Sequence, residues 1–293
     1  MKDTSELLKK VRKIEIKTRG LSKNIFAGEY HTAFKGRGMT FAEVREYQPG
    51  DDVKFIDWSV TARFNHPYIK VFEEERELTV MLLVDVSGSG EFGTSVMSKK
   101  DMMVEIAATI AFSAIQNNDK IGMIFFSDKI EKFIPPQKGK KHTLYLIREL
   151  LSFEPESRKT DVAGALRYFT NVIKKHCTAF VISDFMDNVA DSSFTSALTI
   201  ANRKHDVAAI QVYDHRESEL PAIGLMKVKD AESGSDMWID TSSKKLRIAY
   251  KADWLRRQDE LRQALSRSGV DTVSVATNED YVKALMKLFK LRA

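Results

Sequence analysis

The stretch VMLLVDVSGSG, residues 80–90, decides the fold of this 293-residue chain. Five apolar residues run into an acid, and a short continuous apolar run is typical of a strand buried in a parallel sheet. The acid, two serines and two glycines lie at the C-terminal end of this strand, where open α/β sheets bind ligands. Residues 98–116 then show an apolar stripe at helical spacing, with Ser98 as N-cap and Asp101 in the first turn. The stretch therefore predicts a strand, a ligand-binding loop and a helix.

Apolar strands and amphipathic helices alternate along the rest of the chain. Further strands are predicted at 121–126, 179–183, 207–213 and 272–275, with 129–134 pairing as a hairpin with 121–126. Helices are predicted at 142–151, 162–173, 194–203, 254–265 and 281–291. Residues 216–250 break the pattern and predict a β-hairpin with its turn near residues 232–235. Strands separated by helices predict an α/β fold with a doubly wound, mostly parallel sheet and helices on both faces.

The N-terminal part differs from this pattern. Residues 4–17 predict a basic amphipathic helix, residues 20–66 are punctuated by glycines and predict a loop-rich segment, and residues 68–72 predict a strand. We expect residues 1–77 to form a segment that packs on a main domain of residues 78–293. The charged and aromatic block at residues 28–63 has two interpretations, a salt-bridged and aromatic-anchored cap or a docking surface for a partner.

Composition limits the class of protein. The chain carries 46 basic and 41 acidic residues, and this mild excess does not argue for nucleic-acid binding. Its single cysteine, Cys177, rules out an intrachain disulfide and is predicted to be a packed thiol. The charged start is unlike a signal peptide, and no apolar run is long enough for membrane insertion. We therefore expect a cytoplasmic protein.

Three kinds of ligand compete for the loop after the first strand. Gly88, Gly90 and Gly93 have the spacing of a dinucleotide-binding loop, but Asp85 would repel a pyrophosphate, and Thr94 stands where a phosphate-binding P-loop needs lysine. Asp85 could instead be the nucleophile of an aspartyl phosphoenzyme, although such sites carry a second acid where this chain has Ser87. The third candidate is a divalent cation held by oxygen atoms.

The cation explains the loop best. Asp85, Ser87 and Ser89 offer a carboxylate and two hydroxyls at alternate positions, and Thr160 and Asp184 are placed to reach the same sheet edge. Such oxygen ligands suit Mg²⁺, or Mn²⁺. Each residue also has an ordinary structural explanation: Thr160 as a helix N-cap, the serines as turn formers, and Asp184 as a loop acid.

These five residues, in this order, resemble the metal-ion-dependent adhesion site of von Willebrand factor A domains. In that family the serines and the threonine contact the metal, and the acids often act through water. An open coordination position takes a carboxylate from a partner protein. The resemblance therefore implies a binding module and a von Willebrand factor A-like fold, not an enzyme.

Short blocks along nearly the whole chain resemble a bacterial family catalogued as domain of unknown function fifty-eight. They are GEYH at 28–31, GRGM at 36–39, FAEVREY at 41–47, GDD at 50–52, IDW at 56–58, AR at 62–63, FEEERE at 72–77, ISDF at 182–185 and ELP at 219–221. Its members are commonly encoded beside MoxR-type AAA+ ATPases. The resemblance implies a metal-dependent adaptor that works with such an ATPase to assemble or activate another protein complex. A metal-dependent hydrolase using the same oxygens is the alternative.

Overall fold

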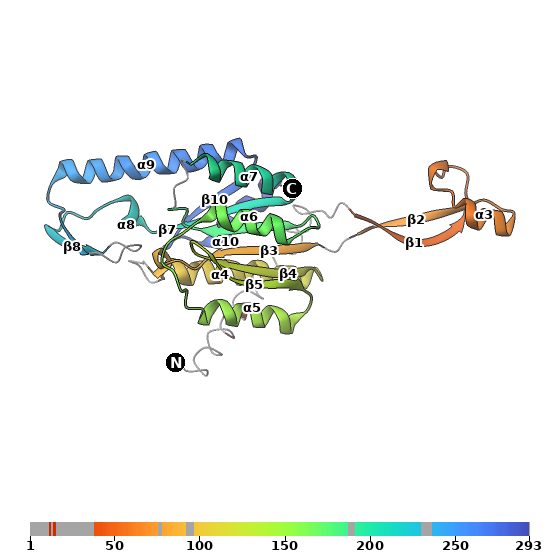
Figure 1. Cartoon of the computed structure of the whole chain (residues 1–293), viewed down its shortest axis with the longest axis horizontal. Coiled ribbons are helices and arrows are strands. Elements are labelled where there is room, and N and C mark those ends of the chain that lie inside the picture. Colours follow the sequence, from red (N-terminus) through yellow and green to blue (C-terminus); the bar gives the residue numbers. More distant parts are fainter. Residues whose placement is uncertain are drawn as a thin grey trace. The chain divides into compact units, whose positions relative to one another are not determined.

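The computed structural model describes Arg12, Ile14, Glu15 and residues 38–75, 78–91, 97–186, 191–229 and 236–292. The chain forms two compact units: one comprises Met1–Phe34 and Thr79–Ala293, and the other comprises Lys35–Leu78. Figure 1 shows the first unit as a sheet with helices on both faces and the second as a two-stranded ribbon carrying a short helix.

The first unit is built on a six-stranded sheet with the order β10-β7-β6-β3-β4-β5. The strands are β3 (Thr79–Asp85), β4 (Lys120–Phe126), β5 (Ile130–Gln137), β6 (Thr178–Ser183), β7 (Asp206–Tyr213) and β10 (Asp271–Ala276). All neighbours are parallel except β4 and β5, which form the predicted antiparallel hairpin. The predicted α/β architecture, a doubly wound and mostly parallel sheet, is confirmed.

The chain reverses its direction of travel across the sheet between β3 and β6. From β3 it moves outward through β4 to β5, then returns to β6 on the other side of β3 and continues through β7 to β10. Val84 of β3 lies opposite Ile182 of β6, so the two strands end side by side. Loops that leave such a switch point diverge and open a crevice at the carboxyl ends of the strands.

Helices cover both faces of the sheet, as predicted. Met81 and Leu83 of β3 join the core formed with α6 (Val162–Val172), α7 (Ser192–Lys204) and α9 (Lys244–Arg267). On the opposite face lie α4 (Lys99–Gln116), α5 (Lys140–Ser152) and α10 (Tyr281–Arg292). The predicted helix at residues 4–17 lies mostly outside the described residues, but Ile14 is helical and packs on the cluster that joins α4 to α5.

Two elements differ from the prediction. The helix predicted at residues 254–265 begins ten residues earlier, where the Ser243 side chain caps α9. Only Leu261, Ala264 and Leu265 of α9 are buried, so its first half lacks the apolar periodicity by which a helix is recognised. The short helix α8 (His215–Ser218) follows β7, where the sequence predicts no helix. The predicted hairpin is present as β8 (Leu225–Lys229) and β9 (Asp236–Asp240), and its predicted turn lies outside the described residues.

The second unit has more regular structure than expected in residues 38–66, while residues 20–37 of the predicted loop-rich segment lie outside the described residues. Residues 38–46 form the strand β1 (Gly38–Glu46), which pairs antiparallel with β2 (Tyr68–Glu75), and the turn η2 (Val53–Phe55) and the helix α3 (Trp58–Phe64) lie between them. The Arg45 guanidinium donates to both carboxylate oxygens of Asp51, at 2.8 and 2.7 Å. Trp58 is 69% exposed, so it does not anchor this unit by burial.

No helix within the described part of the chain is both long and apolar enough to cross a membrane.

Candidate metal centre

Asp85 ends the central strand at the switch point and is almost fully buried. Its Oδ1 accepts a hydrogen bond from the Ser87 backbone N–H at 2.9 Å, which turns the chain out of the strand. Its Oδ2 accepts from the Ser183 hydroxyl at 2.6 Å, across the seam between β3 and β6. The carboxylate is therefore fixed in place by the two strands whose ends define the crevice.

The two serines lie in the turn that follows β3. The Oγ atoms of Ser87 and Ser89 are 3.0 Å apart, so the two hydroxyls point to the same place. The turn is the 3₁₀ helix η3 (Gly88–Glu91), and the Gly88 N–H donates to the Arg158 carbonyl at 3.0 Å. Asp85, Ser87 and Ser89 are thus brought together as the sequence predicts, although Gly93 and Thr94 of the competing phosphate-loop interpretations lie outside the described residues.

Thr160 lies in the segment that the Gly88–Arg158 hydrogen bond ties to this turn. It is half-buried, one residue before Asp161, whose N–H donates to the Ser127 carbonyl at the end of β4. The alternative role of Thr160 as a helix N-cap is wrong. Asp161 caps α6 instead, because its Oδ1 accepts from the Gly164 N–H at 2.7 Å.

Asp184 follows β6 and is 1% exposed. Its Oδ1 accepts from the Met186 N–H at 3.1 Å, and its Oδ2 accepts from the Lys99 ammonium at 2.7 Å. Phe185, the next residue, has a left-handed backbone (φ 53°), which bends the chain sharply away from the strand. Asp184 lies in the loop directly after β6, as its ordinary structural explanation has it, and it is there a buried, ion-paired carboxylate.

Sequence reasoning missed two further residues of the site, Lys99 and Glu217. Lys99 is the first residue of α4, has no solvent exposure, and pairs with both Asp184 and Glu217. Glu217 is held by a capping box, in which its Oε2 accepts from the Asp214 N–H at 2.9 Å. One signal was present in the sequence: a lysine at a helix N-terminus opposes the helix dipole and so needs an acidic partner.

The local charges favour a bound cation. Burial and, second, the negative charge of Asp184 raise the pKa of Asp85 to about 7, although the hydrogen bonds from Ser183 and Ser87 act in the opposite direction. Burial also raises the pKa of Glu217, against the attraction of Lys99. Burial lowers the pKa of Lys99, but Asp184 and Glu217 outweigh it and keep Lys99 charged. Two acids, Asp184 and Glu217, therefore pair with the one ammonium group, and the charge of Asp184 also acts on Asp85.

The donor set fits a hard divalent ion. Asp85, Ser87 and Ser89 present oxygen atoms only, which suits Mg²⁺ or Mn²⁺ better than a softer metal. The described residues contain no group of three or more His, Cys, Asp or Glu side chains that could hold a metal. A site built here must therefore use the serine and threonine hydroxyls as well as the carboxylates.

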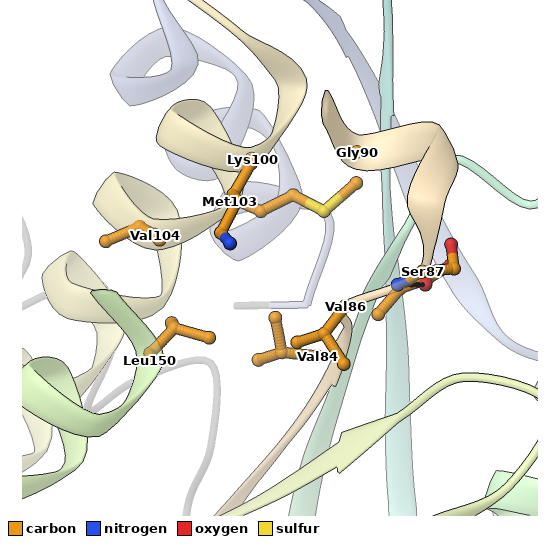
Figure 2. A pocket seen from close by; sticks show the side chains of 9 residues that line it. Val84, Val86, Ser87, Gly90, Lys100, Met103, Val104 and Leu150 are labelled. Carbon is orange, nitrogen blue, oxygen red and sulfur yellow. Dashed lines mark hydrogen bonds between the residues drawn. The ribbon is translucent and has the colours of Figure 1, made fainter. Parts of the chain in front are cut away.

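A small pocket lies behind the turn, between β3 and the helices of one face. Figure 2 shows Lys100, Met103 and Val104 of α4 and Leu150 of α5 around it, with Ser87 at the side where the turn begins. Most of the lining is apolar, and Asp85, Ser87 and Lys100 are its polar residues.

Comparisons with known proteins identify the family of this chain and solved structures that resemble it. The family model described as "Protein of unknown function DUF58" matches residues 43–260. An uncharacterized protein of Mycobacterium tuberculosis, Rv1480, is 28% identical over 294 residues, covering 99% of this chain and 91% of the relative. An aerotolerance-related membrane protein from Bacteroides fragilis has a similar fold, with a TM-score of 0.50 at 14% identity over 73% of this chain and 98% of the other. The SpRpn10 VWA domain matches 73% of this chain and 95% of its own, with 11% identity and a TM-score of 0.39.

Proposed function

Because this chain belongs to the family of proteins of unknown function DUF58, we propose that it is a metal-dependent protein-binding adaptor and not an enzyme. Asp85, Ser87 and Ser89 would hold Mg²⁺ or Mn²⁺, with Thr160 and Asp184 completing the set. The bound ion would offer a coordination position to a carboxylate of an unidentified target protein.

One observation carries this proposal. At the switch point of the sheet, the buried carboxylate of Asp85 lies beside a pair of serine hydroxyls only 3.0 Å apart. Burying an ionised carboxylate next to the acid Asp184 is unfavourable unless a cation or proton compensates it. The buried carboxylate lowers the stability of the metal-free protein, and it lies at the edge of the sheet where ligands bind. This combination supports a site that binds a cation.

The partner is proposed from the family resemblance. Members of this family are commonly encoded beside MoxR-type AAA+ ATPases, and we propose such an ATPase as the partner. The adaptor would present a target complex to the ATPase for assembly or activation. Pull-down of the ATPase by wild type but not by Asp85→Ala in Mg²⁺ would support metal-mediated docking, and equal capture in EDTA would contradict it.

The metal-dependent hydrolase is kept as the alternative on a single observation. The acid Asp184 lies close enough for its charge to raise the pKa of Asp85, so a base is present beside the proposed metal ligands. However, both oxygens of Asp184 already accept hydrogen bonds, from the Met186 N–H and the Lys99 ammonium group. Phosphoester turnover that Asp85→Ala abolishes would favour this alternative over the adaptor.

The direct test of the metal site is a thermal shift. Protein stripped with EDTA is melted at pH 8 with increasing Mg²⁺ or Mn²⁺. A ligand that binds only the folded state stabilises it by about 2.7 kcal/mol at a hundredfold excess over Kd, which raises Tm by roughly 5–10 °C. We expect a saturable increase for the wild type and none for Asp85→Ala.

Asp128→Ala is the matched control, because Asp128 is an exposed carboxylate in the turn after the neighbouring strand β4. We expect it to respond to metal like the wild type. Equal shifts for wild type and Asp85→Ala would refute binding at this centre.

A further inference from the structure

We propose that the ammonium group of Lys99 is a permanent positive charge within the metal centre. It limits the negative charge of the centre and thereby sets the affinity of the centre for the divalent ion. The inference rests on the proposed function and adds a specificity-determining residue to it. Lys99 would not be a ligand of the metal. It would act on the metal through Asp184.

The position of Lys99 is the first argument. Its side chain is completely buried, and its Nζ lies 2.7 Å from Oδ2 of Asp184. The other oxygen of that carboxylate accepts the Met186 N–H at 3.1 Å. Both oxygens of Asp184 accept hydrogen bonds, so the carboxylate is held in one orientation. The positive charge of Lys99 therefore controls how strongly the negative charge of Asp184 attracts a cation at the sheet edge.

The hydrogen bonds that hold the partner of Lys99 in place are the second argument. Glu217 pairs with the same ammonium group, and its carboxylate is held by the Asp214 N–H at 2.9 Å. Asp214 is itself fixed by the Thr277 hydroxyl at 2.7 Å, at the end of β10. The pair therefore connects α4 to strands on the other side of the switch point, and it is rigid enough to act as a fixed charge.

The net charge of the ion-paired side chains determines how Lys99 affects metal binding. Asp184 and Glu217 both pair with Lys99, so these three side chains together carry a net charge of −1 when all are ionised. Without Lys99 the same carboxylates would carry −2, and without Glu217 the pair of Lys99 and Asp184 would carry no net charge. Charges a few ångströms apart in a buried site interact by more than 1 kcal/mol, so removing either charged partner changes the affinity for the metal.

The test measures Mn²⁺ affinity at pH 8, by counting free Mn²⁺ with electron paramagnetic resonance. Glu217→Gln leaves the pair between Lys99 and Asp184 intact, and we expect it to weaken binding by roughly tenfold or more. Lys99→Met removes the positive charge and should strengthen binding by a similar factor. The double variant restores the net charge and should return to within about threefold of the wild type.

A matched control lies at the opposite edge of the sheet. Arg292 is a largely buried cation that pairs with two acids, Asp206 and Asp271, at the starts of β7 and β10. We expect Arg292→Met to change the net charge of the protein as Lys99→Met does, but to leave Mn²⁺ affinity within about twofold.

The outcomes separate the two proposals. Unchanged or weaker binding by folded Lys99→Met, as judged by its Tm, overturns the inference. If Lys99→Met does not fold, the result for Glu217→Gln is decisive. Mn²⁺ affinity of Glu217→Gln equal to that of the wild type overturns the inference about Lys99 and leaves the proposed function intact. Binding by Lys99→Met but not by the wild type overturns the proposed function and supports the role of Lys99. Binding by neither protein overturns both.

Discussion

At the scale of single residues, the centre is a set of buried charges that do not balance without a ligand. Asp85 is the clearest case, since burial next to Asp184 raises its pKa to about 7. Such a group lowers the stability of the metal-free protein whenever it is ionised. Two predictions belong to this scale, and each concerns a buried group whose charge the fold disfavours.

The first prediction concerns Asp85→Asn without metal. In the unfolded chain Asp85 titrates near pH 3.9, and in the fold near pH 7, so the folded state binds more protons between these values. The free energy of unfolding of the wild type therefore falls, relative to the variant, as the pH rises from about 4 to 7. At pH 8 in EDTA we expect the variant to be more stable by about 1–3 kcal/mol, measured by urea unfolding. A less stable variant would contradict the buried-charge argument.

The second prediction concerns His205, which is 1% exposed. Burial lowers the pKa of His205 to about 4, helped by the positive charges of Lys204 and His176, and Nδ1 lies 3.4 Å from the Cys177 Sγ. Its unfolded pKa is near 6.5, so the unfolded state binds more protons between pH 4 and 6.5. We expect the wild type to lose about 2 kcal/mol of stability across this range as the pH falls.

His205→Leu should lose less stability than the wild type over the same range of pH, while the exposed His66→Gln should behave like the wild type. Urea unfolding at pH 4.5 and 7 measures the difference. Identical pH dependence in the wild type and His205→Leu would show that other groups control the acid sensitivity.

Cys177, the neighbour of His205, is buried, as predicted for a packed thiol, and this burial raises its pKa to about 12.

At the scale of elements, Gly122 is the position where β4 lies close to both β3 and β5. A Cβ on Gly122 would lie 2.7 Å from the Met81 Sδ and 2.9 Å from the Ile134 carbonyl oxygen. The second contact is with backbone, which cannot move without distorting the β4–β5 pairing. The register of these two strands already shifts between Ile121 and Met123.

We therefore expect Gly122→Ala to destabilise the protein by about 1–3 kcal/mol. Gly90→Ala is the matched control, because a Cβ there meets only the Lys100 Cβ at an ordinary 3.8 Å. Its stability should stay within about 0.5 kcal/mol of the wild type. The measurement is urea unfolding in EDTA, and equal stability of Gly122→Ala and the wild type would contradict the clash.

At the scale of the whole molecule, local patterns predicted the sheet but not the charge network that completes its site. The buried run before Asp85 and the apolar stripe of α4 are properties of short windows, and they predicted both elements to within a few residues. The first half of α9 was missed because little of it is buried. Lys99 was missed because its partners lie 85 and 118 residues away, and only the folded topology shows that they meet.

The pairing of Lys99 with Asp184 and Glu217 also has a consequence for how the first unit is assembled. The ammonium group belongs to the half that contains β3, β4 and β5, and both carboxylates belong to the half that contains β6, β7 and β10. If the backbone were cut between α5 and α6, the two fragments would meet along β3 and β6 and dock through this buried ion pair. Fragment complementation would then be a direct report on the pair, since each piece alone carries an uncompensated charge.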